Sequence, residues 1–338
     1  MILIFSQSED ETSTENVIDW LFYKKQQYFR LNGSDLKNNC LSFELSDKGS
    51  NMIIHNEKIP SLNQFKAVWF RRWANPDFMT KEAEITAEKL NWRKRNSLDR
   101  VIKLHLKEEG KKVSDWFLSK FKGKMALSSS GFKSINKIDV LEKSCKLGLE
   151  IPATLITSKK KELSGFIEKY KSVITKPISE GLVYVDKSQN KEECYSMFTE
   201  QLDYQSLDRI PENFIRSLFQ EKLNKAYEIR SFFIDNNFYS MAIFSQCNPN
   251  TGIDFRHYDT MNPNRNEPYA LPRNVEEKLA ELMKLLELET GSIDIVKTTD
   301  GRFAMLEVNP VGQFGMVSLP CNYYLEEKVA DALIRRAN

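Results

Sequence analysis

The chain has 338 residues, 41% of them hydrophobic, which allows about two or three domains with a substantial core. With 49 basic and 47 acidic residues the net charge is +2, so we expect neither nucleic acid nor a membrane as partner. No apolar run approaches the roughly 18 residues of a membrane-spanning helix. The five cysteines are scattered without a CxxC pair, which argues against a zinc site or a disulfide framework and favours a cytoplasmic location.

The N-terminal third predicts alternating strands and helices. Residues 1–6 are apolar without a preceding basic region, which favours a first core strand over a signal peptide. Residues 12–15 resemble a capping box at the start of a helix. Further strands are expected to end at 29–31 and to span 67–70. These elements predict an α/β N-terminal domain over residues 1–122.

A central subdomain is expected over residues 123–217. An amphipathic helix is predicted over 137–147, followed by an extended segment at 151–157, where a proline disfavours helix. A second helix is predicted over 163–170 and a strand over 172–176.

The C-terminal subdomain is expected over residues 218–338. A strand is predicted at 219–223, and a hairpin joins residues 229–234 to 238–244 through Asn236-Asn237. A helix over 275–286 follows. Because antiparallel strands here come with segregated helices, this part is expected to be α+β.

One polar hairpin stands out in this apolar C-terminal sequence. Asp294 lies in a β-branched run, and Asp300-Gly301 predicts the turn to a return strand. Strict alternation would put Met305, Glu307 and Asn309 on one face. The acids and the amide could then bind Mg²⁺, which takes oxygen ligands. A solvated edge hairpin would give the same pattern.

Four further features carry polar side chains that could take part in a site, and three of them also have a purely structural explanation. Lys137 and Lys176 could hold nucleotide phosphates, or lie at the surface. Gln220 and Glu221 interrupt an apolar strand whose edge could offer backbone groups to an adenine; an edge strand with a wet face is the alternative. Glu228 and Arg230 share a strand face and could form an exposed ion pair. Asp254 to Arg256 lies in a loop, where functional side chains are often displayed.

The order of these features resembles that of ATP-grasp carboxylate ligases, with the ending Leu306-Glu-Val-Asn-Pro310 as the specific part. The sequence is most similar to the graspetide, or microviridin-type, macrocyclising ligases, including those of grasp-with-spasm systems. The segments that carry this narrower likeness are residues 13–21, 68–73, 148–157, 219–222 and 253–258. The resemblance implies an ATP-grasp fold preceded by an α/β pre-ATP-grasp domain.

The resemblance also implies residue roles. Lys137 and Lys176 would contact ATP phosphates, Glu221, Lys222 and Leu223 would form the adenine hinge, and Glu228 would hold ribose. The implied Mg²⁺ ligands are Asp294, Glu307 and Asn309, and Arg230 and Arg256 would face the reacting carboxylate. Two departures from the family pattern are a phosphate loop with only Gly181 and an amide, Gln246, where simpler ligases often have arginine.

The implied reaction converts Asp or Glu side chains of a ribosomal precursor peptide to acyl phosphates with ATP, and closes ω-ester or ω-amide rings with Ser, Thr or Lys side chains. Arg71 and Arg72 could assist, or form a strand-end ion pair. A leader segment could bind near Glu200, Asp203 and Asp208. A homodimer is expected from the resemblance alone.

Two alternatives to this reaction stay open. A ligase of the same fold could join an external amino acid or amine to a carboxylate. A non-catalytic ATP- or peptide-binding protein could also keep the fold, although it would have no need of all three proposed Mg²⁺ ligands.

Overall fold

The structure is a computed structural model whose chain forms two compact units, residues 1–134 with 324–338, and residues 135–323. It describes residues 1–7, 11–33, 41–47, 49–54, 57–58, 60, 62–71, 96–121, 125–127, 135–179, 183–186, 193–197, 199–246 and 261–338. The boundaries predicted after residues 122 and 217 stay predictions. Within the described part, no helix is both long and apolar enough to cross a membrane.

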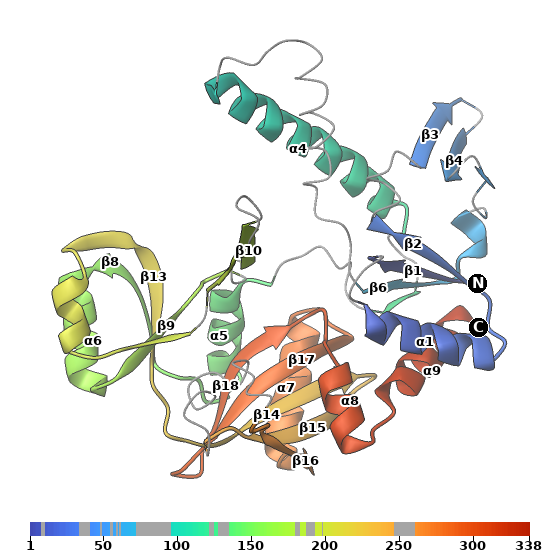
Figure 1. Ribbon diagram of the computed structural model, residues 1–338. Helices are drawn as coiled ribbons and strands as arrows, with labels where there is room; N and C mark the ends of the chain where they lie inside the picture. Colours follow the sequence, from blue (N-terminus) through green and yellow to red (C-terminus); the bar gives the residue numbers. More distant parts are fainter. Residues whose placement is uncertain are drawn as a thin grey trace. The chain divides into compact units, whose positions relative to one another are not determined.

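The first unit is built on a four-stranded parallel sheet with the order β2-β1-β6-β7. The strands are β1 (Ile2–Ser6), β2 (Tyr28–Asn32), β6 (Ala67–Phe70) and β7 (Met125–Leu127). Helix α1 (Thr12–Tyr23) packs beside α9 (Leu325–Ala337), the last helix of the chain (Figure 1). The α/β class predicted for the N-terminal part of the chain is therefore confirmed.

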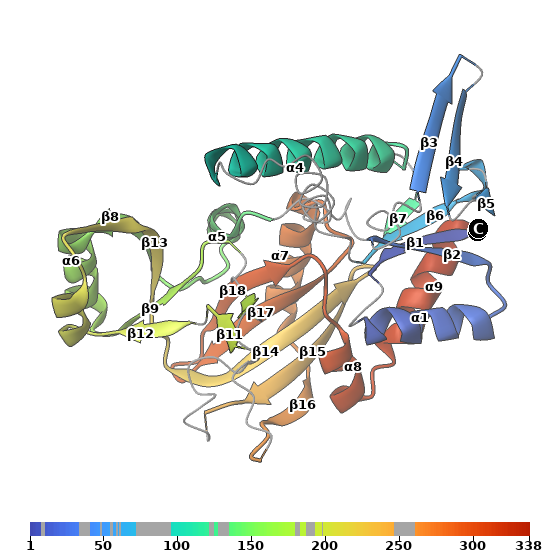
Figure 2. The ribbon, with the colours of Figure 1, turned by 45° about the horizontal axis from the view of Figure 1, so that its top comes forward.

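Buried aromatic side chains form the core of this unit. Phe5 stacks on Phe70 and meets Phe117 and Phe121 edge-on, with Phe117 in α4 (Asn96–Ser119). A separate antiparallel sheet contains β3 (Leu41–Ser46), β4 (Gly49–Ile54) and β5 (Glu57–Lys58), and a short helix η1 (Leu62–Gln64) follows (Figure 2).

The capping box predicted at residues 12–15 is not formed. Helix α1 already begins at Thr12, and Glu11 takes the N-cap position without a side-chain cap. The Thr14 hydroxyl instead donates a hydrogen bond to Glu11 Oε2 at 2.8 Å.

The second unit contains an antiparallel sheet with the order β12-β9-β13-β8. Its strands are β8 (Thr154–Lys159), β9 (Val173–Lys176), β12 (Glu200–Leu202) and β13 (Asn213–Glu221). Helix α6 (Lys160–Tyr170) lies against this sheet (Figure 2). Leu163, Ile167 and Phe219 are buried between the helix and the sheet. A hairpin of β10 (Val183–Asp186) and β11 (Glu193–Ser196) and a short helix η2 (Gln205–Arg209) complete this region.

The other sheet of the second unit is antiparallel with the order β16-β15-β14-β17-β18. The strands are β14 (Lys225–Ile234), β15 (Asn237–Phe244), β16 (Arg265–Tyr269), β17 (Thr290–Thr298) and β18 (Phe303–Asn309). Helices α5 (Lys137–Lys146) and α7 (Arg273–Leu285) share a buried core with this sheet (Figure 1), and α8 (Gly315–Cys321) packs against β14 to β16.

The two faces of this second sheet have different chemistry. Ile229 and Phe233 on β14 and Ile293 and Ile295 on β17 belong to the core shared with α7. Because side chains alternate along a strand, the residues between them point to the opposite face. That opposite face carries the polar residues of the site. The apolar core on the other side of the same sheet holds their strands in place.

Candidate functional site

A cleft of about 750 Å³, including open space at its mouth, lies within the second unit. Side chains from both sheets line it. They are Pro152, Ile174, Lys176, Thr199, Gln220, Glu221, Lys222, Leu223, Lys225, Glu228, Asp294, Val296, Leu306 and Glu307. Seven of the predicted site residues are therefore brought together in one cleft: Lys176, Glu221, Lys222, Leu223, Glu228, Asp294 and Glu307.

The predicted hairpin pairs its two acids directly, and a bulge follows. Asp294 on β17 pairs with Glu307 on β18, but the next pair joins Ile295 to Met305 and skips Leu306. Strict alternation was therefore wrong here. Met305 packs in the core, while Leu306 and Glu307 both line the cleft.

Arg230 binds Asp294 on the neighbouring strand. Its Nη1 donates to both carboxylate oxygens of Asp294, at 2.8 and 2.9 Å. The arginine side chain is 6% exposed and that of Asp294 is 14% exposed. Arg230 Nε and Nη2 are buried and have no hydrogen-bond partner in the described part of the chain. Two buried donors beside the cleft-lining Asp294 are suited to an anionic ligand.

Glu228 shares the strand face of Arg230 but has a different ion-pair partner. Its Oε1 accepts hydrogen bonds from Lys225 Nζ at 2.8 Å and from Ser245 Oγ at 3.0 Å. Burial raises the pKa of Glu228, while Lys225 and Ser245 act to lower it. The alternative of an exposed pair between Glu228 and Arg230 is therefore wrong, because both side chains are buried and bind other partners.

The two predicted phosphate-binding lysines lie on different elements. Lys176 ends β9 and lines the cleft. Lys137 is the first residue of α5, whose N-terminus is capped by Asn136. Lys137 Nζ lies 3.4 Å from Glu307 Oε2, so the lysine is adjacent to the cleft without being among its lining residues.

The predicted hinge begins at Glu221, the last residue of β13, which is an internal strand and not an edge. Glu221 Oε1 accepts from the backbone N–H of Ala153 at 2.9 Å, and the Glu221 N–H donates back to Ala153 O at 3.0 Å. The side chain of Lys222 reaches Gln201 at 2.7 Å. The chain from Glu221 to Leu223 is thus held at the cleft by contacts of its own side chains and backbone.

The donor set fits a hard cation. Asp294 and Glu307 place two carboxylates opposite each other in the cleft, and Mg²⁺ typically takes one or two carboxylates together with phosphate oxygens. No group of three His, Cys, Asp or Glu side chains with metal-binding geometry occurs among the described residues. Asn309 lies on β18 outside the cleft lining, and its Oδ1 accepts from Val311 N–H at 3.0 Å. Its role as a ligand stays a prediction.

Polar cleft residues that were not among the predicted site residues include Lys225 and Gln220. Lys225 forms the ion pair with Glu228, and Gln220 is fully buried where β13 meets the cleft. The signal for Gln220 was a polar residue in an apolar strand. For Lys225 the sequence offered only its three-residue spacing from Glu228. That spacing indicates an ion pair only once the strand geometry is known.

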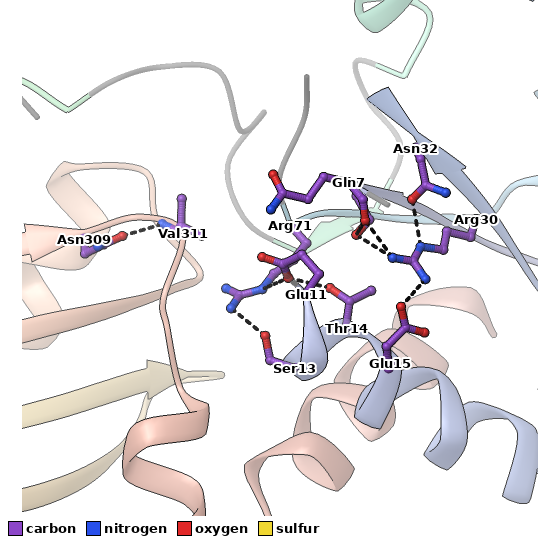
Figure 3. A network of polar contacts seen from close by, with 11 residues as sticks. Gln7, Glu11, Ser13, Thr14, Glu15, Arg30, Asn32, Arg71, Asn309 and Val311 are labelled. Atoms are coloured by element: carbon purple, nitrogen blue, oxygen red, sulfur yellow. Dashed lines mark hydrogen bonds and ion pairs between the residues drawn. The ribbon is translucent and has the colours of Figure 1, made fainter. Parts of the chain in front are cut away.

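Arg71 lies in the first unit, at the end of β6, in a polar network (Figure 3). Its Nε lies 3.3 Å from Glu11 Oε2 and its Nη2 donates to Ser13 Oγ at 2.9 Å. The side chains of Arg71 and Glu11 are 3% and 2% exposed. This arrangement agrees with the ion-pair alternative, and a substrate role for Arg71 stays a prediction. Arg72 and Arg256 lie outside the described residues.

The three acids proposed to bind a leader lie in or near η2. Glu200 is exposed on the edge strand β12, and Asp208 lies within η2. Asp203 accepts hydrogen bonds from the Ser206 backbone at 3.0 Å and hydroxyl at 2.8 Å, and these bonds lower its pKa. Asp203 therefore stabilises a local turn, and leader binding by the three acids stays a prediction.

Comparisons with known proteins agree with this fold. Residues 1–90 match the model of the MvdD pre-ATP-grasp domain. The macrocyclase MdnC of Microcystis aeruginosa MRC, bound with its precursor peptide MdnA, superposes with a TM-score of 0.77 at 23% identity, covering 99% of each chain. A RiPP-associated ATP-grasp ligase of Chryseobacterium gregarium, in complex with ADP and a leader and core peptide, has a TM-score of 0.77 at 20% identity, covering 100% of this chain and 97% of that one.

A third structure, the ATP-grasp ligase PsnB complexed with a minimal precursor, Mg and ADP, has a TM-score of 0.74 at 19% identity and covers 100% of this chain and 97% of its own. No curated protein matches the sequence. The chain thus has the ATP-grasp fold with an N-terminal pre-ATP-grasp domain. The resemblance to graspetide-type ligases stated from the sequence motifs is confirmed.

Proposed function

We propose that this protein is an ATP- and Mg²⁺-dependent ligase that activates Asp or Glu side chains of a ribosomal precursor peptide and closes macrocycles with Ser, Thr or Lys side chains. The observation that carries the proposal is the buried guanidinium of Arg230 beside the paired acids Asp294 and Glu307. Its Nε and Nη2 have no hydrogen-bond partner among the residues that the structure describes. The structures with ADP, Mg and precursor peptides named above support the choice of ligands.

The residues in the cleft and beside it divide between the nucleotide and the peptide. Lys176 and Lys137 supply positive charge for the nucleotide phosphates, and residues 221–223 border the base. Asp294 and Glu307 would hold Mg²⁺, which when bound offsets charge on the phosphoryl group being transferred. Arg230, anchored by Asp294, directs its remaining N–H donors at the peptide carboxylate or its acyl phosphate.

The reaction then has two balanced steps. A carboxylate oxygen of the peptide forms a bond to the γ-phosphorus of ATP as the bond to the β-phosphate oxygen breaks, which gives an acyl phosphate and ADP. A hydroxyl or amine of the same peptide attacks the carbonyl carbon and loses its proton, and inorganic phosphate leaves. The peptide loses one water per ring. Positioning and electrostatics by Arg230 and the lysines carry both steps.

The test is mass spectrometry of a precursor peptide encoded beside this gene, incubated with the protein, ATP and Mg²⁺. We expect the loss of one water mass per ring. Mild alkaline hydrolysis separates the linkages, because esters reopen and amides do not. An increase in mass would instead identify a ligase that adds an external amino acid or amine, and nucleotide binding with no change of peptide mass would identify a non-catalytic binding protein.

Two variants test whether the reaction takes place in the cleft. Glu307→Gln removes a metal-ligand charge and is expected to lower product formation on the order of 100-fold or more. Glu281→Gln makes the same change on an exposed position of α7 and is expected to retain wild-type rates. Unchanged rates in Glu307→Gln would contradict the metal assignment.

A further inference from the structure

The turn that follows β18 holds both oxygens of Asn309, the last residue of that strand. The backbone N–H of Val311 donates to Asn309 Oδ1 at 3.0 Å (Figure 3), and the N–H of Gly312 donates to the backbone oxygen of Asn309 at 3.1 Å. Because the Val311 N–H is a donor, the amide atom that faces it must be the oxygen. This one bond leaves the amide oxygen a second lone pair for a metal ion.

Asn309 lies on the same strand face as Glu307. The pairing of β18 with β17 is regular over this stretch, with Glu307 opposite Asp294 and Asn309 opposite Ser292. Residues two apart in a regular strand point to the same face. The turn therefore holds an amide oxygen on the face that carries both acids.

Gly312 closes this turn in a conformation that glycine adopts without strain. Its φ is +61°, in the left-handed region. A Cβ atom at Gly312 would also lie 3.0 Å from Cε2 of Phe232 and 3.2 Å from Cα of Gly291. Both distances are shorter than an ordinary contact between carbon atoms. Any side chain at this position would therefore push the turn away from the sheet.

The neighbours of Gly312 are rigid parts of the sheet. Gly291 lies in β17, and the Phe232 ring is 1% exposed and packs on Phe314 with 5.2 Å between ring centroids. Gly291 also approaches Asn309, because a Cβ atom at Gly291 would lie 3.1 Å from the backbone oxygen of Asn309. The two glycines thus let the turn that holds Asn309 lie directly on β17.

We propose that Gly312 is a positioning residue, whose contact with Gly291 holds the Asn309 amide oxygen where it can bind the Mg²⁺ of Asp294 and Glu307. The inference rests on the proposed function, because it takes Mg²⁺ to bind at these two acids. A side chain at position 312 would displace Asn309 and leave the lysines and residues 221–223 in place. The affinity for Mg²⁺ should therefore fall, while the affinity for nucleotide without metal should not.

The test measures the affinity for ADP by calorimetry over a series of Mg²⁺ concentrations and in EDTA. We expect the wild-type protein to bind ADP more tightly with Mg²⁺ than in EDTA. In Gly312→Ala, the Mg²⁺ concentration that gives half of this gain should rise by about 10- to 100-fold, the usual effect of disturbing a group that orients a metal ligand. The affinity for ADP in EDTA should stay at the wild-type value.

Gly301→Ala is the matched control. Gly301 also has a positive φ, +94°, but a Cβ atom there would meet none of the described residues within 4 Å. Both variants should lose stability in urea, because alanine is strained at a positive φ. Only Gly312→Ala should change the Mg²⁺ dependence of ADP binding. An equal change in Gly301→Ala would mean that backbone strain alone is responsible, and would overturn the inference.

Gly291→Ala disturbs the same contact from the other side, at a residue whose backbone is not left-handed. Its Cβ atom would meet Asn309 O at 3.1 Å and the flexible end of Met283 at 3.0 Å. This milder variant should also raise the Mg²⁺ requirement, and it tests the inference if Gly312→Ala does not fold. A wild-type Mg²⁺ dependence in either folded variant overturns this inference alone. If Mg²⁺ does not change the ADP affinity of the wild type, the metal assignment of the proposed function fails, and the inference with it.

Discussion

Glu228 is a buried carboxylate with both a cationic partner and a raised pKa. Burial is the largest cause of the shift, and the nearby Asp294 adds to it, while the Lys225 ammonium opposes it. A carboxyl whose pKa is higher in the folded chain than in the unfolded chain binds its proton more tightly when folded. Its protonation therefore stabilises the fold at low pH.

The first prediction concerns the pH dependence of stability. The stabilising contribution of Glu228 is fully present below the usual glutamate pKa of 4.5 and is lost as the pH rises through the raised pKa of the folded chain. Glu228→Gln has no carboxyl to deprotonate, so its stability does not lose this contribution as the pH rises. We therefore expect the free energy of unfolding of the wild type, relative to this variant, to fall with rising pH. Urea unfolding followed by circular dichroism across this window measures it, and a constant difference would contradict the assignment.

At the scale of elements, the bulge in β18 sets the composition of the cleft wall. Without it, Leu306 would point into the core shared with α7. With it, Leu306 and Glu307 both face the cleft while Met305 and Val308 stay in the core. One extra residue therefore adds an apolar contact beside a metal-binding acid, as bulges next to active sites often do.

The second prediction is that deletion of Leu306 preserves the sheet and weakens nucleotide binding. The pairs Ile295–Met305 and Asp294–Glu307 become consecutive after the deletion, and each side chain keeps its face. Loss of the apolar contact should weaken ADP binding by about tenfold. Leu306→Ala keeps the bulge and should weaken binding similarly. An unfolded deletion variant, judged by circular dichroism, would show that the bulge is required for the fold.

A second element-scale feature is the polar network at the ends of β1, β2 and β6 (Figure 3). Arg71 and Glu11 are both buried, whereas Glu15, which pairs with Arg30, is 52% exposed. Removal of one partner from a buried pair leaves an uncompensated charge, while an exposed pair contributes little.

The third prediction follows from that contrast. Glu11→Gln should lower the free energy of unfolding of the first unit by about 3–5 kcal/mol. Glu15→Gln should change it by about 1 kcal/mol or less. All five tryptophans lie between residues 20 and 116, so tryptophan fluorescence in urea follows this unit specifically. Similar effects of the two substitutions would mean that the Glu11–Arg71 pair is not the stabilising contact.

At the scale of the whole molecule, the cleft and the tryptophans belong to different units. Every cleft-lining residue falls within residues 135–323. A ligand that binds only the folded cleft stabilises the second unit by mass action. The two units can therefore be followed separately in one unfolding experiment.

The fourth prediction is that Mg²⁺-ADP at 100 times its dissociation constant raises the free energy of unfolding of the second unit by about 2.7 kcal/mol. Circular dichroism in urea, compared with tryptophan fluorescence in the same samples, assigns the shift to a unit. Chelation of Mg²⁺ should reduce it, because Asp294 and Glu307 would then repel the phosphates. No shift in either signal would contradict nucleotide binding.

The sequence predicted those parts of the fold and site that depend on local pattern. The hairpin at residues 294–309, the helix of α7 and the strand-helix alternation of the first unit follow from turn residues and apolar periodicity. The N-terminal capping box failed because Thr14 bonds Glu11 instead. The expectation of an edge strand failed because strand order depends on partners distant in sequence, with β13 placed between β8 and β9.

By itself, the sequence determined which charged residues the site would contain and in what order, because residue types and their spacing are local properties. Only the tertiary structure decided how they are paired. Arg230 binds Asp294 and not Glu228, and a bulge turns Leu306 toward the cleft. The tertiary structure also fixes the amide of Gln220, whose Nε2 donates to the hydroxyl oxygen of Thr154. These outcomes depend on the register between strands and on burial, which are set by contacts across the whole sheet and not by neighbours along the chain.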